Sequence, residues 1–308
     1  MDKIVVYLDL DGTLLTDEKS ITSRNVDLIR KAHQEYGVQF AIATARTTSI
    51  AEGVAAEIGE ACKYVMSSNG ATVKHLETGE YIHDKSIPMD KREKLIEFCT
   101  ENNLGYMAMT PEARYFPIGY EYVKDLDQHM SAKFPDSTRF VENVEEYALN
   151  PDNKILSFAV IGGEEKLLAH SEELKEIAGI SVARLCHYST SGEYPNSSYL
   201  DVMGENVDKG TAMESIKQHS GASKTAAFGD GNNDIEMISV ADYGFVMRNA
   251  DPELMREAKI YACTVDNNNE SGVGETLYDF LEYLEKKGKI EKNPDYIGKA
   301  SDINYDER

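Results

Sequence analysis

Apolar runs of strand length alternate with stretches of helical periodicity at the beginning of the chain. Residues 4–8 are apolar without a break, which is typical of a strand that is covered on both faces. Apolar residues then recur at helical spacing over residues 22–36, with Thr22 as a candidate N-cap and Gly37 where a glycine ends a helix. Residues 38–43 form a second apolar run. This strand–helix–strand order is the parallel crossover unit, and it predicts an α/β fold.

A third apolar run completes this part of the core, and the same pattern returns after about residue 193. Apolar runs predict strands, and stretches that begin with a capping residue predict the helices between them. The predicted strands cover residues 64–68, 199–203, 225–228, 243–247 and 260–264, and the predicted helices begin near residues 208, 251 and 275.

The segment between these parts has a different character, because short strands and helices alternate in it and tyrosine and charged residues occur throughout. Helices are predicted at residues 88–102, 126–133 and 164–177, and strands at residues 105–110, 114–116, 154–161 and 180–186. The pattern predicts a compact α+β insert. The predicted division is a discontinuous core of residues 1–81 and 193–288, an insert of residues 82–192, and a loosely held polar tail of residues 289–308.

The composition narrows the possible partners. The 308 residues carry 54 acidic and 32 basic side chains, for a net charge of −22. Such a surface repels nucleic acid and anionic lipid, and no apolar run is long enough to span a bilayer, so neither nucleic acid nor a membrane is an expected partner. The N-terminus leads directly into a strand without the layout of a signal peptide, which favours a cytoplasmic location. The oligomeric state has no sequence signal.

Two carboxylates follow the first strand directly. Asp9 and Asp11 stand on either side of Leu10, and Gly12 follows as a turn former. A buried strand that ends in carboxylates brings charge to the carboxyl edge of a parallel sheet, where open α/β sheets bind their ligands. Two carboxylates so close together repel each other unless a cation or a shared proton relieves the repulsion. On these residues alone, an ordinary strand exit with two solvated aspartates is the alternative.

The longer string around these aspartates is more specific. After an apolar strand near the N-terminus, Asp9-Leu-Asp-Gly-Thr13 resembles the nucleophile motif of the haloacid dehalogenase superfamily of phosphotransferases. Three further motifs are expected downstream in a fixed order. A candidate for each is present, so the resemblance extends over roughly residues 1–287.

The second motif and a neighbouring substrate segment have candidates at the ends of the next two strands. Thr44 falls on the Ser/Thr that binds phosphoryl oxygens, and it is followed by Ala45 and Arg46 where many relatives have Thr-Gly-Arg, so the turn must accommodate a Cβ. The string Ser-Ser-Asn69-Gly-Ala resembles a segment of the Cof-like branch that lies beside the substrate. Without the resemblance, Thr44 would be a helix cap, Arg46 a solvated side chain and Asn69 part of a hairpin turn.

The third and fourth motifs have candidates near the later core strands. Lys209 lies in the first turn of a predicted helix, where the helix dipole disfavours a cation. In the resemblance it is the lysine that neutralises the phosphate and the charge of the nucleophile. The acidic, glycine-rich loop that contains Asp230, Asn233 and Asp234 matches the fourth motif, and it lacks the ligand spacing of an EF-hand.

The resemblance implies a Rossmann-like, doubly wound parallel sheet as the core and an α+β cap of type IIB as the insert. It further implies a Mg²⁺-dependent phosphatase that hydrolyses small phosphorylated metabolites through an aspartyl-phosphate. Asp9 would be the nucleophile and Asp11 the general acid and base, with Mg²⁺ bound by Asp9, Asp230 and the backbone carbonyl of Asp11. Asp234 would orient Lys209 or a water on the metal. The substrate-binding residues would be Thr44, Ala45, Arg46, Asn69, Lys209 and Asn233.

Three other functions share parts of this pattern. A phosphomutase would use the same pair of aspartates, but the hexose mutases of the superfamily have a longer glycine-rich string in the fourth motif. A dehalogenase would leave Asp11 without a role, because no leaving group would need a proton. A regulatory protein that only binds a phosphorylated ligand would not need all four motifs.

Overall fold

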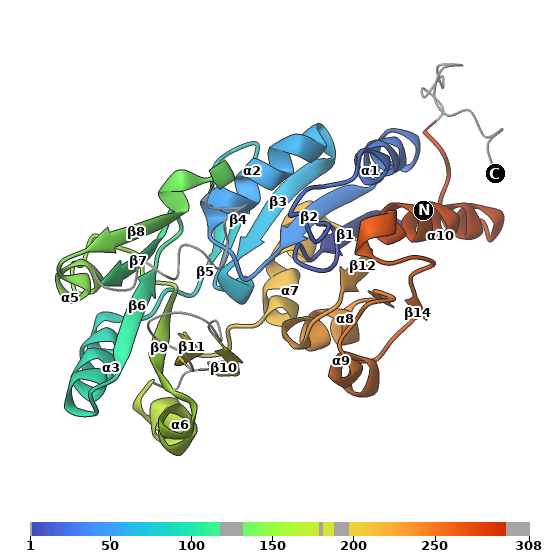
Figure 1. The fold of residues 1–308 in the computed structure, drawn as a ribbon. Helices are drawn as coiled ribbons and strands as arrows, with labels where there is room; N and C mark the ends of the chain where they lie inside the picture. The colour runs from blue at the N-terminus through green and yellow to red at the C-terminus, as the bar shows by residue number, and fades with distance from the viewer. Residues whose placement is uncertain (1, 118–131, 179–180, 188–196, 294–308) are drawn as a thin grey trace.

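Two β-sheets organise the protein, one in the core and one in the inserted segment (Figure 1). The computed structural model describes residues 2–117, 132–178, 181–187 and 197–293. Among the described residues, no helix combines the length and the apolar character that a membrane span requires.

The core sheet has eight strands, and the two halves of it come from segments far apart in the chain. In order across the sheet they are β14 (Ala262–Cys263), β13 (Tyr243–Val246), β12 (Lys224–Gly229), β1 (Ile4–Leu8), β2 (Gln39–Ala43), β3 (Cys62–Ser67), β4 (Thr72–His75) and β5 (Tyr81–Asp84). Neighbours from β14 to β3 pair parallel, whereas β4 and β5 pair antiparallel. The topological switch point lies between β1 and β12, because the strand order runs outward from each of them.

Helices cover both faces of the core sheet. One face packs against α1 (Ser23–Tyr36), α2 (Thr48–Ile58) and α10 (Gly272–Lys286), and the other against α7 (Lys209–Ser220), α8 (Ile235–Val240) and α9 (Pro252–Glu257). In β1, Ile4, Val6 and Leu8 join the first layer, while Val5 and Tyr7 join the second. The uninterrupted apolar run of β1 therefore serves two cores, and the predicted doubly wound α/β core is confirmed.

Capping residues fix where α1 and α7 begin. The Thr22 side chain accepts the N–H of Asn25, and Gly37 ends α1 with a left-handed φ of 68°. Asp208 accepts the N–H of Thr211 at 2.7 Å. Lys209 is consequently the first residue of α7, at the end of the helix that points toward the carboxyl edge of the sheet.

The second sheet lies in the insert and has six strands within the described residues. Their order is β10 (Ser181–His187), β11 (Ser197–Met203), β9 (Ser157–Gly163), β6 (Gly105–Met109), β7 (Arg114–Pro117) and β8 (Thr138–Val141). The helices α3 (Met89–Glu101), α5 (Val144–Ala148) and α6 (Glu164–Ala178) share one apolar core with this sheet. A separate cluster that includes Met107, Met109 and Phe116 lies on its other face. The predicted α+β insert is confirmed, although most of the predicted helix at residues 126–133 lies outside the described residues.

The boundaries of the insert differ from the predicted ones. The sequence pattern places residues 199–203 in the resumed core, but β11 pairs antiparallel with β9 from Ser197–Gly163 to Met203–Ser157. Hydrophobic alternation identifies a strand without identifying the sheet that it joins, which explains the error. At the other boundary, β5 extends the core sheet to Asp84. The first crossing therefore lies three residues later than predicted, after Asp84 instead of residue 81, and the second lies eleven residues later, after Met203 instead of residue 192.

The beginning of the predicted tail is also held more firmly than expected. Ile290 is 4% exposed and belongs to the main apolar core. The Lys289 carbonyl accepts the N–H of Asp2 at 3.1 Å, and Lys292 forms an ion pair with Glu35 at 3.2 Å. One apolar residue within a polar stretch was too weak a signal to show this contact. Residues 294–308 lie outside the described residues.

Candidate active site

Four predicted site residues follow the carboxyl ends of four neighbouring strands. Asp230 follows β12, Asp9 follows β1, Thr44 follows β2, and Asn69 lies two residues beyond β3. Because these strands are parallel, their carboxyl ends meet at one edge of the sheet. Asp9 and Asp230 lie on the two sides of the topological switch point, where a crevice forms in folds of this kind.

Lys209 connects the first and fourth motifs. Its Nζ donates to Asp9 Oδ1 and to Asp234 Oδ1, at 2.6 Å in each case. All three residues are buried, with whole-residue exposures of 5% or less. Burial disfavours the charged amine, but the carboxylates of Asp234 and Asp9 outweigh this effect and raise the pKa of Lys209. Lys209 is therefore a permanent cation at the base of the site.

The turn after β1 brings Asp230 against the backbone. At Gly12 the φ angle is +77°, and a Cβ there would lie 2.2 Å from Asp230 Oδ2. Only glycine fits both the left-handed conformation and this close approach. Thr13 donates from its hydroxyl to Asp230 Oδ1 at 2.9 Å, so the motif that contains Asp9 also orients Asp230.

Asp234 holds two other parts of the site in place. Its Oδ1 accepts from Lys209, and its Oδ2 accepts the backbone N–H groups of Asp230 and Gly231, at 3.0 Å each. Both carboxylate oxygens are thus engaged. Of the two roles left open by the sequence, this arrangement favours orienting Lys209.

The arrangement fits a divalent cation. Asp9, Asp230 and Asp234 each bring a carboxylate oxygen within 4.8 Å of the others. Burial and the neighbouring charge of Asp234 raise the pKa of Asp9, against the opposing effect of Lys209, and raise that of Asp230 to about 6. The single charge of Lys209 therefore does not compensate the three carboxylates. Hard oxygen donors of this kind suit Mg²⁺. Since Asp234 is engaged elsewhere, Asp9 and Asp230 fit such an ion best.

Asp11 is held by two cations. Arg46 donates from Nε to Oδ2 at 2.6 Å and from Nη2 to Oδ1 at 2.7 Å, and Lys19 Nζ donates to Oδ1 at 2.7 Å. Burial opposes the ionised form, but the hydrogen bonds and charge of Arg46, together with Lys19, lower the pKa of Asp11 to about 2. Arg46, expected near the substrate, is thus paired with the expected general acid.

The loops after β2 and β3 are locked together. The Thr44 hydroxyl accepts the N–H of Arg46 at 3.1 Å, and the Thr44 carbonyl accepts the N–H of Asn69 at 3.0 Å. Asn233 donates from its side chain to the Asn69 side-chain oxygen at 2.9 Å, so the fourth motif reaches this loop. Ala45 is exposed and has no positive φ, so the turn accommodates its Cβ without left-handed strain.

The loop after β3 is strained and touches the insert. Ser68 and Asn69 have φ angles of 49° and 54°, in the left-handed region that non-glycine residues rarely adopt. Strain of this kind is maintained where surrounding contacts impose it, often at functional sites. The Ser68 hydroxyl lies 3.1 Å from the Met109 sulfur, which places one face of the insert's sheet beside the core loop.

The sequence pattern missed three polar contacts of the site. Thr13 belongs to the first motif, and this position was the one feature of the sequence that could have indicated its contact with Asp230. Lys19 and Asn249 lie in irregular loops without periodicity, so no pattern pointed to them. Asn249 donates to the Gly12 carbonyl at 2.8 Å and thereby supports the turn between Asp9 and Asp230.

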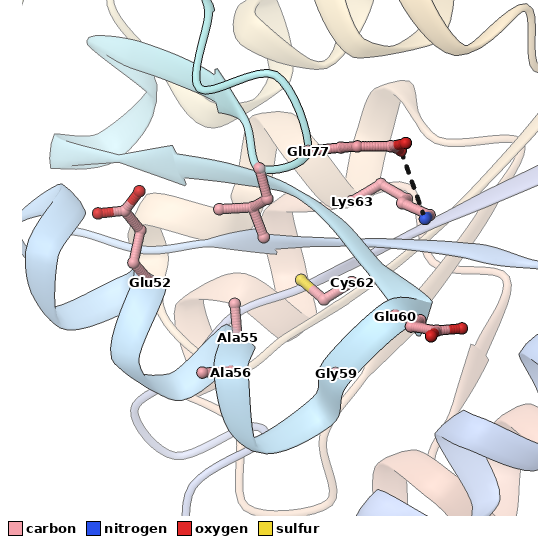
Figure 2. Close-up of a pocket in the computed structure, with 9 residues that line it drawn as sticks. Glu52, Ala55, Ala56, Gly59, Glu60, Cys62, Lys63 and Glu77 are labelled. Carbon is pink, nitrogen blue, oxygen red and sulfur yellow. Dashed lines mark ion pairs between the residues drawn. The ribbon is translucent and has the colours of Figure 1, made fainter.

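A cavity of about 320 Å³ lies elsewhere on the core, beside α2 and the start of β3 (Figure 2). Cys62 is the first residue of β3, so this cavity lies near the amino end of the strand, opposite the edge that carries Asn69. Its charged lining consists of Glu52, Glu60 and Glu77 with only Lys63 as a cation. Such a lining does not suit a phosphate group.

Comparisons with known proteins agree with this geometry. A protein of Haemophilus influenzae with the provisional name of phosphatase is 27% identical over 268 residues, which cover 85% of this chain and 92% of that protein. A haloacid dehalogenase-like hydrolase from Bacteroides thetaiotaomicron has a similar structure, with a TM-score of 0.73 and 25% identity, over 91% of this chain and all of that one.

A solved sugar phosphatase of haloacid dehalogenase subclass IIB has the same fold, with a TM-score of 0.69 and 22% identity, over 94% of this chain and 100% of that one. The family model for haloacid dehalogenase-like hydrolases matches residues 6–277, which include all four motifs and the insert. The chain therefore belongs to the haloacid dehalogenase-like hydrolases.

Proposed function

We propose that the protein is a Mg²⁺-dependent phosphatase of the Cof-like branch, which hydrolyses small phosphorylated metabolites through an aspartyl-phosphate on Asp9. The observation that carries the proposal is the buried junction of Asp9, Lys209 and Asp234, with both ion pairs at 2.6 Å. The names of the relatives support the reaction, since one has the provisional name of phosphatase and another is called a sugar phosphatase.

Asp9 is placed to act as the nucleophile. Lys209 holds its Oδ1, and no other side chain among the described residues donates to the Asp9 carboxylate. A free Oδ2 can attack phosphorus in line with the ester bond. The new bond joins Asp9 to phosphorus while the bond from phosphorus to the ester oxygen breaks.

One cation and two polar side chains are expected around the phosphoryl position. Lys209 supplies a fixed positive charge beside Asp9. Thr44 and Asn69 stand at the ends of the two strands that follow β1 in the sheet, with side chains that can hydrogen-bond phosphoryl oxygens. Their mutual backbone hydrogen bond keeps these donors in place before substrate arrives. Pre-oriented donors stabilise the charge that develops on the equatorial oxygens.

Mg²⁺ would be held by Asp9 and Asp230, with the backbone carbonyl of Asp11 as the third protein ligand. When bound, the ion would neutralise the charge of these carboxylates and polarise a phosphoryl oxygen. Burial and the charge of Asp234 raise the pKa of Asp230 to about 6, so a cation at this position would stabilise its ionised form.

Asp11 transfers the protons. Paired with Arg46 and Lys19 it is ionised, which is the state that accepts a proton from the water that hydrolyses the aspartyl-phosphate. In the first half-reaction it must instead donate a proton to the ester oxygen. A phosphate dianion beside Asp11 attracts Arg46 and repels the carboxylate, and both effects raise the pKa of Asp11.

The leaving group distinguishes this role experimentally. Asp11→Asn should slow the first half-reaction of an alkyl phosphate far more than that of nitrophenyl phosphate, because an alkoxide needs a proton and nitrophenolate does not. Single-turnover rates of both esters, with and without EDTA, provide the measurement. Equal slowing of the two esters would exclude Asp11 as the acid, and full activity in EDTA would exclude the metal.

A further inference from the structure

We propose that Lys19 is a positioning residue that fixes which oxygen of Asp11 meets the leaving group. This inference rests on the function proposed above, and it concerns a residue outside the four motifs. Lys19 lies eight residues beyond Asp11, in the loop between β1 and α1.

The hydrogen bonds on Asp11 are unequal. Oδ1 accepts from both Lys19 and Arg46, whereas among the described residues Oδ2 accepts only from Arg46. A carboxylate oxygen has two acceptor positions, so the position that remains lies on Oδ2. Without Lys19, the fork of Arg46 would leave one position on each oxygen. Lys19 therefore makes the carboxylate asymmetric and selects Oδ2 for proton transfer.

Lys19 is held by a defined turn. The Lys19 N–H donates to the Thr16 carbonyl, and the Thr16 N–H donates to the Ser20 carbonyl, at 2.9 Å each. Lys19 itself has a left-handed φ of 59°. This conformation costs about 1 kcal/mol for a residue with a Cβ, so neighbouring contacts must maintain it.

Those contacts tie the turn to the core. The Asp17 carboxylate accepts from the side chains of Asn268, at 3.1 Å, and Asn269, at 3.0 Å. The Asp17 N–H in turn donates to Asn269 Oδ1 at 3.0 Å. The backbone of Lys19 is thus anchored within its own turn through Thr16, and Asp17 ties that turn to the segment before α10.

The anchoring separates this ion pair from ordinary surface pairs, which contribute little because two flexible side chains must be ordered. Lys175 and Glu172 form such a pair on α6 at 2.6 Å, close to the 2.7 Å of the Lys19 pair, with side-chain exposures of 47% and 81%. Lys19 and Asp11 are 31% and 39% exposed, and Arg46 already orders the carboxylate. The Lys175 pair is therefore a matched control.

Three variants test the proposal in full-length protein with Mg²⁺. Lys19→Met keeps the length of the side chain and removes the donor, Lys19→Arg keeps a donor, and Lys175→Met removes the control pair. Single-turnover rates are measured for an alkyl phosphate and for nitrophenyl phosphate. Lys19→Met should lower the alkyl rate at least about tenfold more than the aryl rate, because misplacement of an acid matters most for a basic leaving group.

Lys19→Arg should restore most of the alkyl rate, and Lys175→Met should change neither rate. Asn269→Ala, which loosens the turn but keeps Lys19, should produce a weaker loss with the same dependence on the leaving group. Melting temperatures close to that of the wild type show that the variants fold.

The outcomes separate this inference from the proposed function. If Lys19→Met slows both esters equally, or neither, Lys19 does not position Asp11, while hydrolysis by the wild type still supports the phosphatase. If the wild type hydrolyses neither ester with Mg²⁺, the proposed function itself is contradicted, and the positioning role with it.

Discussion

Replacing Lys209 by Met tests how the site compensates its buried charge. Lys209 is fully buried, and its two partners, Asp9 and Asp234, have side-chain exposures of 8% and 1%. Removing one partner of a buried ion pair costs about 3–5 kcal/mol, because the remaining charge stays desolvated. The loss has an upper bound, since one carboxyl group can bind a proton instead. Protonating a carboxyl group with an ordinary pKa near 4 costs about 4 kcal/mol at pH 7, because each pH unit above the pKa adds about 1.4 kcal/mol.

The cost of the broken ion pair and this upper bound together predict that Lys209→Met lowers the free energy of unfolding by about 3–4 kcal/mol at neutral pH. The chain has no tryptophan, so urea unfolding is best followed by circular dichroism. The double variant Lys209→Met with Asp234→Asn removes one negative charge and should recover part of the loss. Added Mg²⁺ should stabilise Lys209→Met more than the wild type. A loss below about 1 kcal/mol, with no response to Mg²⁺, would refute this account of the charge balance.

Three further predictions follow from the same geometry. Gly12→Ala should weaken Mg²⁺ binding, measured by calorimetry, and should lower the free energy of unfolding in urea more than Gly79→Ala does. Both glycines have a left-handed φ, but only a Cβ at Gly12 would meet Asp230. Asp230→Asn should raise the Mg²⁺ concentration needed for half-maximal hydrolysis, and an unchanged requirement would exclude Asp230 as a ligand. Burial and Asp234 raise the pKa of Asp230 from 3.8 to about 6, so the metal-free native state binds a proton more tightly than the unfolded chain. The free energy of unfolding should therefore fall as pH rises through this range, and saturating Mg²⁺ should remove this pH dependence.

The core fold and the assembly of the four motifs were predictable because each depends on a local signal. The apolar run of β1 and the caps Thr22 and Asp208 fixed the elements, and parallel strands bring their carboxyl ends together whatever the loops between them do. Asp9 and Asp230 therefore meet although 221 positions in the numbering separate them.

Contacts that depend on three-dimensional packing were not predictable. The strand β11 has the same alternation in either sheet, so only its pairing with β9 reveals that it belongs to the insert. Ile290 is a single apolar residue in a polar segment, and its burial depends on packing against the main apolar core. The ion pair of Lys19 with Asp11 depends on a left-handed turn that no sequence period signals.

The central claim is that Asp9 carries the phosphoryl group during turnover. The direct measurement is to quench the wild-type protein in acid during hydrolysis of a phosphate ester with Mg²⁺, and to map the phosphoryl group by mass spectrometry of the peptides. The account predicts one added phosphoryl group on the peptide that contains Asp9, and none on Asp9→Asn, which should also have lost turnover. Active turnover with the label on another residue, or hydrolysis by Asp9→Asn at the wild-type rate, would contradict it.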